Sequence, residues 1–401
     1  MKIVVIETII DGPIIGGGNL YLPGLIKGLV QNGHEVHLVV KGTPNVKVLD
    51  LINVSGAIMH NKPWKKKGLV TDLAPVLAEW VNQLNPDIYL ISGSYDIGWL
   101  ALPFIDPKIA TFATAHSNTD NYYSPVKHYK DFITIAIGVS DEICKNFSKV
   151  SNIEKEKIEW IPYGIKPSTS VQERIDDETL HIIFAGRLEE YQKRISDVKE
   201  IIKKLAVSDI KFHFQIIGDG SEYLNIKNDL SAEIAKGNIE MLGWVSGDKV
   251  LEAFKNSDVF ILTSSSEGFS ISLIEAMANG CCPVVTDIPS GSIQLIESNK
   301  NGFLIPIGDI EKFVERLVYL YGNKTDLLRI RKAAWEVGKK FSVERMVDAY
   351  IKCFKKGANY TKNHLRLSNK NFPVMQSSRS KYPSWIRKIK LFLFNETGFS
   401  Q

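Results

Sequence analysis

Short apolar runs rich in β-branched residues alternate with helical patterns along this chain, and one polar stretch interrupts the alternation. The run KIVVIET at residues 2–8 and the run DIYLISG at 87–93 have the composition of buried strands. Between such runs lie segments such as residues 69–84, where apolar residues recur at the spacing of an amphipathic helix. Strands that alternate with helices indicate a parallel sheet covered by helices on both faces.

The polar stretch KPSTSVQERIDDETL begins at Lys166 and is typical of a linker. After it the alternation restarts with the run HIIFAGR. The sequence therefore predicts an α/β protein with two doubly wound, Rossmann-like domains, at residues 1–165 and 179–340, joined by a linker at 166–178. Ligands of such sheets bind at the carboxyl ends of the strands, so we expect the functional site in a central cleft that both domains face.

Composition favours a globular protein of the reducing cytoplasm. The chain has 401 residues, of which 44% are hydrophobic and 23% charged, and no uninterrupted apolar stretch approaches the roughly 20 residues that span a bilayer. Its four cysteines have neither metal-ligand spacing nor the density of a disulfide scaffold. The N-terminus carries one basic residue before an apolar run that Glu7 interrupts, which is not the pattern of a secretory signal.

The charge of the chain is concentrated in its C-terminal tail. Residues 361–401 hold eight lysines and arginines against one acid, Glu396, whereas the whole chain carries a net charge of only +4. This asymmetry disfavours a nucleic-acid partner and favours one local contact with an anionic surface. Within residues 379–394, Trp385, Ile389 and Leu393 recur at i, i+4 and i+8 beside basic residues, which is typical of an amphipathic helix on anionic lipid. A helix packed back on the protein and a disordered end are the alternatives.

Two loops that follow predicted strands have residues suited to phosphates. In DGPIIGGGN, Gly16 and Gly17 let the backbone approach a ligand just before a helix N-terminus, although an ordinary turn explains them equally well. The spacing is not the GxGxxG of a dinucleotide site, which disfavours an NAD-dependent dehydrogenase. In FAGRLEEYQKR, Arg187 ends a strand and Lys193 begins the next helix, so the two cations are placed to clamp a pyrophosphate; solvated surface charges are the alternative.

The stretch SSSEGFSISLIEAMANG carries two carboxylates, Glu267 and Glu275, eight residues apart. We expect the strand before it to end near Ser264 and a helix to begin near Ser270, a good N-cap. Glu275 then lies one turn inside an almost wholly apolar helix, where a carboxylate is costly unless something donates hydrogen bonds to it. Ribose hydroxyls are suitable donors. The alternatives are a buried salt bridge for Glu275 and a surface loop position for Glu267.

His116 follows directly after the predicted strand KIATFATAH. A lone histidine is more often a structural residue than a functional one. Its place at the carboxyl end of a strand in the N-terminal domain favours a functional role, because that edge borders the predicted cleft.

Together these residues resemble the retaining glycosyltransferases of the GT-B fold, specifically glycosyltransferase family 4. The resemblance covers the chain to about residue 356, and the segment 341–356 is then expected to be a C-terminal helix that returns to the N-terminal domain, followed by the basic tail 357–401. Single motifs are weak, but their order and spacing are specific. The motifs are GGGN, TAHSN, AIGVSDEI, IPYGI, FAGRLEEYQKR, IIGDGSE, MLGWV, SSSEGFSISLIEAMANGCCPVVTD and NGFLIPIGD.

The resemblance implies a role for each candidate residue. Glu275 would hold the ribose of a donor nucleotide, Glu267 would contact the hydroxyls of the donor sugar, and Arg187 with Lys193 would neutralise the diphosphate. His116 would contact the transferred sugar or orient the acceptor. The remaining donor-binding residues implied are Gly16, Gly17, Gly243, Trp244, Val245, Gly268, Phe269, Ser270 and Ile271.

The implied reaction is transfer of a sugar from a nucleotide-diphosphate sugar with retention of anomeric configuration. Because fixed cations and helix-terminal amides stabilise the leaving group, no metal and no cofactor are expected. Ser246 follows MLGWV where some GDP-using members carry an acid, which favours a UDP-sugar, and Asn19 replaces a glutamate common in the family. We expect a glycan or lipid-linked acceptor in cell-surface polysaccharide or glycoconjugate synthesis, and a cytoplasmic protein peripheral to the inner face of the plasma membrane. The alternatives are a nucleotide-sugar epimerase, a disaccharide synthase and a non-catalytic nucleotide-sugar sensor.

Overall fold

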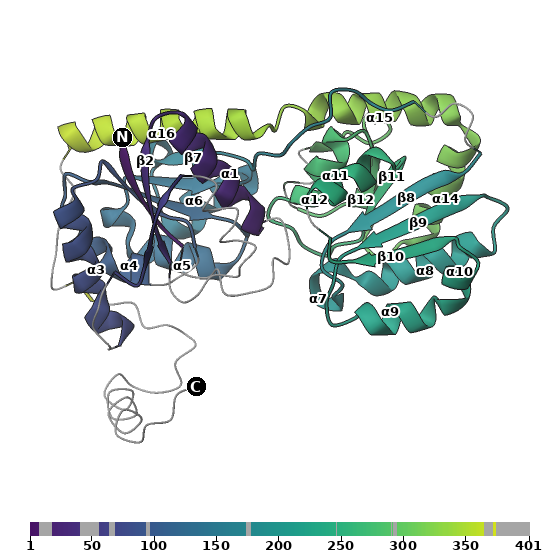
Figure 1. The fold of residues 1–401 in the computed structure, drawn as a ribbon, viewed down its shortest axis with the longest axis horizontal. Helices are drawn as coiled ribbons and strands as arrows, with labels where there is room; N and C mark the ends of the chain where they lie inside the picture. Colours follow the sequence, from purple (N-terminus) through teal and green to yellow (C-terminus); the bar gives the residue numbers. More distant parts are fainter. Residues whose placement is uncertain are drawn as a thin grey trace, which may run out of the picture.

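The computed structural model consists of two parallel-sheet domains that lie side by side (Figure 1). It describes residues 1–7, 18–40, 56–63, 69–93, 97–173, 178–245, 247–289, 291, 295–364 and 372–373. Both sheets are wholly parallel in the described residues, and helices cover their faces. The predicted fold class, two Rossmann-like domains of the GT-B kind, is therefore confirmed.

The N-terminal sheet has seven strands in the order β3-β2-β1-β4-β5-β6-β7. Its central strands are buried along their whole length, which matches the near-continuous apolar runs read from the sequence. The strand order reverses between β1 and β4, so the carboxyl ends of these two strands border a topological switch point. The strands are β1 (Lys2–Ile6), β2 (Glu35–Val40), β3 (Ile58–Asn61), β4 (Ile88–Ile91), β5 (Ala110–Ala115), β6 (Ile135–Gly138) and β7 (Ile158–Trp160).

The helices of the N-terminal domain lie between successive strands. Helix α6 begins where the Ser140 hydroxyl accepts a hydrogen bond from the amide of Ile143, and helix α3 ends at Asn85 in the left-handed conformation. The elements are α1 (Gly18–Gln31), α3 (Val70–Leu84), α4 (Ile97–Ala101), α5 (Asp120–His128), α6 (Asp141–Ser151) and the short 3₁₀ segments Leu102–Phe104, Lys130–Phe132 and Lys155–Lys157.

The C-terminal sheet has six strands in the order β10-β9-β8-β11-β12-β13, with its switch point between β8 and β11. Its strands are β8 (Leu180–Ala185), β9 (Phe212–Ile217), β10 (Ile239–Gly243), β11 (Val259–Leu262), β12 (Cys282–Thr286) and β13 (Phe303–Ile305). Its helices are α7 (Glu190–Lys193), α8 (Ile195–Ala206), α9 (Tyr223–Asp229), α10 (Ser231–Ala235), α11 (Gly247–Lys255), α12 (Ile271–Ala278), α14 (Ile310–Gly322) and α15 (Lys324–Gly338).

The last helix, α16 (Val343–Asn363), lies along the N-terminal domain and packs against α1 and β5 (Figure 1). It continues beyond the segment 341–356 that the sequence suggested. The two connections between the domains run side by side, because the Ile165 amide donates to the carbonyl of Phe341 at 2.8 Å and the Val343 amide donates to the carbonyl of Ile165 at 3.1 Å. Among the described residues, no helix is long and apolar enough to cross a bilayer.

Candidate active site

The serine loop, residues 263–270 between β11 and α12, lies at the carboxyl edge of the C-terminal sheet. Ser270 is the N-cap residue of α12, as expected, but its hydroxyl makes no capping hydrogen bond and instead lies 3.3 Å from the Ser272 hydroxyl. Within the described part of the chain, the amides of Phe269, Ser270 and Ile271 donate to no backbone or side-chain acceptor. This helix N-terminus therefore presents amide donors, the groups that bind a phosphate.

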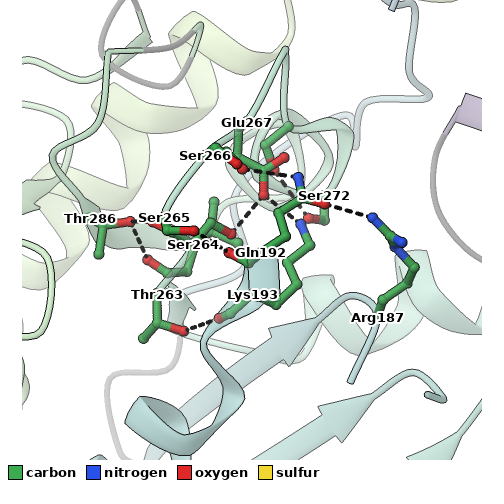
Figure 2. A network of polar contacts seen from close by, with 12 residues as sticks. Arg187, Gln192, Lys193, Thr263, Ser264, Ser265, Ser266, Glu267, Ser272 and Thr286 are labelled. Atoms are coloured by element: carbon green, nitrogen blue, oxygen red, sulfur yellow. Dashed lines mark hydrogen bonds and ion pairs between the residues drawn. The ribbon is translucent and has the colours of Figure 1, made fainter. Parts of the chain in front are cut away.

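Glu267 and Lys193, which the sequence placed in separate motifs, form a direct ion pair (Figure 2). Lys193 Nζ donates to Glu267 Oε1 at 2.5 Å, and the Ser264 hydroxyl donates to the same oxygen at 2.7 Å. Both charged side chains are at most one-tenth exposed. Among the described residues, Glu267 Oε2 has no partner, so one oxygen of a largely buried carboxylate is available to a hydroxyl donor.

The main chain around this ion pair is held from two strands. The Thr263 hydroxyl donates to the carbonyl of Lys193 at 2.8 Å, and the Thr286 hydroxyl, at the end of β12, donates to the carbonyl of Ser264 at 2.6 Å. The Ser265 amide also donates to the carbonyl of Gln192 at 2.8 Å. These hydrogen bonds hold α7 against the serine loop, so Lys193 and Glu267 are positioned relative to each other.

Arg187 lies on the same network but is more exposed, with 42% of its side chain accessible. One guanidinium nitrogen donates to Gln192 Oε1 at 2.6 Å and another to Glu189 Oε2 at 3.2 Å. Gln192 in turn donates to the carbonyl of Ser266 at 2.9 Å (Figure 2). The sequence analysis missed Gln192 and Glu189, although both stand within five residues of Arg187 in the same loop.

Glu275 lies half-buried one turn into α12, and removal from water raises its pKa to about 7. No described residue donates a hydrogen bond to its carboxylate or forms an ion pair with it. The salt bridge considered as the alternative is thus not present among the described residues. A ligand with hydroxyl donors would supply the missing partners.

His116 follows β5 and contacts the serine loop from the N-terminal domain. A Cβ atom built on Gly268 would lie 2.6 Å from the carbonyl oxygen of His116, so the two domains meet backbone to backbone here. The ring of Tyr163 lies 6.1 Å from that of Phe269 across the same contact. The two domains therefore bring His116 and the predicted donor loop together.

Both ring nitrogens of His116 already have partners. Nε2 donates to the carbonyl of Ser92 at 2.7 Å, and the Tyr163 hydroxyl donates to Nδ1 at 2.8 Å. Burial lowers the pKa of His116 to about 4, so the ring is neutral at physiological pH. Contact with a sugar remains a prediction for His116, and Tyr163, which the sequence analysis did not single out, fixes its orientation.

The loop predicted to contact the base lies at the end of β10. Gly243 has a φ of 61° and its carbonyl accepts a hydrogen bond from the Gly218 amide at 2.9 Å, while Trp244 and Val245 are half-buried.

Some of the predicted site residues lie outside the described residues, so their roles remain predictions: Gly16, Gly17, Ser246 and the tail segment 379–394. Among the residues that the structure does describe, no group of three or more His, Cys, Asp or Glu side chains could hold a metal ion.

Comparison with known proteins agrees with this architecture. The family model "Glycosyltransferase Family 4" matches residues 15–169, and the model "Glycosyl transferases group 1" matches residues 166–337. The chain is 26% identical over 346 residues to an uncharacterized glycosyltransferase of Methanocaldococcus jannaschii, covering 76% of this chain and 85% of that protein. It is 27% identical over 248 residues to a lipopolysaccharide 1,6-galactosyltransferase of Salmonella typhimurium, covering 60% and 67%.

Among solved structures, an Anabaena protein in complex with UDP and glucose superposes with a TM-score of 0.71 at 15% identity, covering 88% of this chain and 99% of that one. The two family models together span most of the chain, one for each domain. The chain therefore belongs to the GT-B glycosyltransferases, with a glycosyltransferase family 4 domain followed by a glycosyl transferases group 1 domain.

Proposed function

We propose that the protein is a retaining glycosyltransferase that moves a sugar from a UDP-sugar to a glycan or lipid-linked acceptor in cell-surface polysaccharide or glycoconjugate synthesis. The observation that carries the proposal is the joined network of Arg187, Lys193 and Glu267 beside the uncapped N-terminus of α12. It combines cations, amide donors and a carboxylate with a free oxygen, which are the groups a sugar diphosphate requires.

The diphosphate binds between α7 and α12. Arg187 is the exposed cation and Lys193 the buried one, and the amides of Phe269, Ser270 and Ile271 complete the site from the opposite side. As the glycosidic bond breaks, negative charge develops on the leaving diphosphate. Preorganised donors in a partly dry site stabilise that charge more in the transition state than in the ground state, and this difference accelerates the reaction. We expect these groups to suffice without a metal.

Glu267 positions the donor sugar rather than attacking it. Its Oε1 is already occupied by Lys193 and Ser264, which leaves Oε2 to accept a hydrogen bond from a sugar hydroxyl. A nucleophile would need a carboxylate free to approach the anomeric carbon, and a paired, nearly buried carboxylate is poorly suited to that. Transfer would instead occur on one face of the sugar, with the leaving phosphate accepting the proton of the acceptor.

Glu275 holds the ribose. It lies on the same helix whose N-terminus binds the phosphates, and its carboxylate has no partner among the described residues. The base then lies toward Gly243, Trp244 and Val245. The solved structure with UDP and glucose supports the choice of a uridine donor, and the galactosyltransferase relative supports a lipid-linked acceptor.

The proposal is tested by incubating the purified protein with UDP- and GDP-sugars and measuring nucleotide release with and without acceptors, in buffer with and without a chelator. We expect UDP release from one donor, no loss of rate with the chelator, and an α-linked product from an α-linked donor by NMR. Arg187→Ala and Lys193→Ala should each lower turnover about 10²-fold or more, as for other donors to developing charge. Lys199→Ala, which removes an ion pair between α8 and Asp229, should not lower turnover.

Turnover with inverted configuration would contradict the retaining mechanism. Tight UDP binding with no turnover on any donor would favour the sensor, and conversion of a donor sugar without an acceptor would favour the epimerase. Near-wild-type rates in both cation variants would show that the diphosphate site is elsewhere.

We also propose that the basic tail brings the enzyme to anionic lipid. Two residues of the tail contact the N-terminal domain: the Phe372 ring lies 4.7 Å from that of Phe132, and His128 Nε2 donates to the carbonyl of Pro373 at 2.8 Å. Phe372 and Pro373 therefore lie beside α5 of the N-terminal domain. Removal of residues 379–401 should abolish binding to phosphatidylglycerol vesicles but leave soluble-donor hydrolysis intact; unchanged vesicle binding would contradict this role.

A further inference from the structure

Arg194, which directly follows Lys193, has a backbone conformation that residues with a Cβ atom rarely adopt. It joins the end of α7 to the start of α8 with a φ of 46° and a ψ of 53°, in the left-handed region. Glycine adopts this region freely, whereas an arginine is strained in it. Strain of this kind persists only where surrounding contacts hold it, and it is frequent beside functional sites.

Two contacts of the Arg194 side chain hold this conformation. The guanidinium binds the carboxylate of Asp197 with two hydrogen bonds, from Nε to Oδ2 at 2.7 Å and from Nη2 to Oδ1 at 3.0 Å. Nη2 also lies 3.3 Å from the position of a Cβ atom built on Gly308, so the guanidinium packs against the loop that follows β13. The side chain therefore fixes the junction of α7 and α8 to the first turn of α8 and to this loop.

An ion pair between residues three apart on a helix usually contributes little to stability. On α8, Glu200 and Lys203 form such a pair, with one contact of 3.3 Å and side chains that are 48% and 43% exposed. The pair of Arg194 and Asp197 differs, because it has two parallel hydrogen bonds and the Asp197 side chain is only 11% exposed. Its contribution is to hold a strained residue in place.

The junction determines where Lys193 lies. Helix α7 has four residues, too few to be stable alone, and Lys193 is its last residue. Helix α8, in contrast, is packed into the core of the C-terminal domain by its apolar face. The Thr263 hydroxyl lies 2.8 Å from the carbonyl oxygen of Lys193 and 3.3 Å from that of Arg194. Because the torsions of Arg194 link the two helices, they set the position of Lys193 relative to α8.

We propose that Arg194, held by Asp197, is a positioning residue that orients Lys193 toward the leaving diphosphate. Among the described residues, the guanidinium of Arg194 forms an ion pair with Asp197 alone, so it acts through the backbone and not through its own charge. The inference rests on the proposed glycosyltransferase function, because it deepens the role given to Lys193. Since Lys193 stabilises charge that develops as the glycosidic bond breaks, its misplacement lowers kcat more than it raises KM.

The test measures UDP release from UDP-glucose, UDP-galactose and UDP-N-acetylglucosamine, and compares variants on the donor that the wild type uses fastest. Arg194→Ala keeps the strain and loses the contact with Asp197, so kcat should fall about tenfold while the donor KM changes less than about threefold. Asp197→Ala removes the same contact and should reproduce this loss. Lys203→Ala, which removes the exposed ion pair of α8, is the matched control and should leave kcat unchanged.

Two further replacements of Arg194 separate its backbone from its charge. Arg194→Gly has no strain to compensate and should retain most of the wild-type kcat. Arg194→Lys keeps the positive charge but cannot form two parallel hydrogen bonds with a carboxylate, so its kcat should lie below that of Arg194→Gly. In the Lys193→Ala background, Arg194→Ala should lower kcat no further, because Arg194 acts through Lys193. A general loss of structure would lower kcat in both backgrounds.

Wild-type kcat in Arg194→Ala overturns the inference, as does an equal loss in the presence and absence of Lys193. An active Arg194→Lys beside an inactive Arg194→Gly also overturns it, because the charge of Arg194 would then matter more than its backbone. If Lys193→Ala itself keeps the wild-type rate, the proposed diphosphate site is wrong, and the role of Arg194 is wrong with it.

Discussion

At the scale of single residues, the site contains two glutamates that differ in their hydrogen-bond partners. Glu267 Oε1 accepts hydrogen bonds from Lys193 and Ser264, whereas the half-buried Glu275 has no hydrogen-bond partner for its carboxylate among the described residues. The ordinary pKa of a glutamate is about 4.3 and that of Glu275 is about 7, so the folded protein binds its proton more tightly than the unfolded chain does. Ionised Glu275 therefore costs free energy until a ligand hydrogen-bonds to it.

This cost predicts a pH dependence of stability. A raised acid pKa means that the free energy of unfolding falls as the pH rises from about 4.5 to about 7, by an amount that approaches about 3 kcal/mol. Glu275→Gln has no such cost, so it should be more stable than the wild type at pH 8 and equally stable at pH 4. Urea unfolding at both pH values, without nucleotide, measures the difference.

The same variant should weaken UDP binding by about 1–3 kcal/mol, because hydrogen bonds to a charged group are lost. Glu252→Gln, which changes an exposed carboxylate on α11, is the matched control for both measurements. If the free energy of unfolding depends on pH equally in the wild type and in Glu275→Gln, the pKa of Glu275 is not raised in the folded protein. Unchanged UDP affinity in calorimetry would contradict the assignment of Glu275 to the ribose.

Sequence reasoning reached these residues singly but not their contacts. The sequence indicated four charged residues because each lies in a segment that follows a predicted strand or in an apolar helix: Arg187, Lys193, Glu267 and Glu275. That Lys193 pairs with Glu267, 74 positions away, follows from the adjacency of β8 and β11, which no local pattern encodes. Glu7, noted only for interrupting an apolar run, lies beside Gly93 at the end of β4, a neighbour that no local pattern in the sequence indicates.

At the scale of elements, the buried parallel strands were predictable from the sequence, whereas two of the edge strands, β3 and β13, were not. Strands β4, β5 and β6 are apolar along their length and were recognised from that pattern. Strand β3 contains His60 and Asn61 and is partly exposed, and β13 has three residues, so neither carries a periodic signal. Both lie at an edge of their sheets, where one neighbour suffices to define a strand.

Gly268, in the loop between β11 and α12, lies against the backbone of the N-terminal domain. A side chain there would meet the carbonyl oxygen of His116 at 2.6 Å and Ser117 Cα at 3.0 Å, contacts with backbone that cannot move aside cheaply. Gly268→Ala should therefore push the serine loop away from the N-terminal domain and lower transfer about tenfold or more through misplacement of the donor relative to the acceptor. UDP affinity should change little.

The control is Gly247→Ala, because a Cβ atom at this position in α11 would meet no atom within 4 Å. Steady-state transfer rates and UDP calorimetry on both variants separate the contact from a general effect of replacing glycine. Wild-type transfer by Gly268→Ala would mean that the two domains need not approach as closely as they do here.

At the scale of the whole molecule, the chain crosses between the domains twice and the crossings are hydrogen-bonded to each other at Ile165. Helix α16 then covers the N-terminal domain, with Val343 beside Gly24 and Gly164 and Val347 beside Gly28. The N-terminal domain is therefore completed by residues from the far end of the chain, and its stability depends on them.

Loss of a core side chain of α16 should therefore destabilise the N-terminal domain. Phe354 is fully buried and its ring lies 4.9 Å from that of Phe112 on β5, so Phe354→Ala should cost about 3–5 kcal/mol of unfolding free energy, as for other buried aromatics. The loss should fall on the N-terminal domain: hydrogen exchange should accelerate at β5 and β6 and stay unchanged at β8 and β9. Tyr360→Ala, at an exposed position of the same helix, should cost far less. Faster exchange confined to α16 itself would show that the N-terminal sheet is stable without its C-terminal helix.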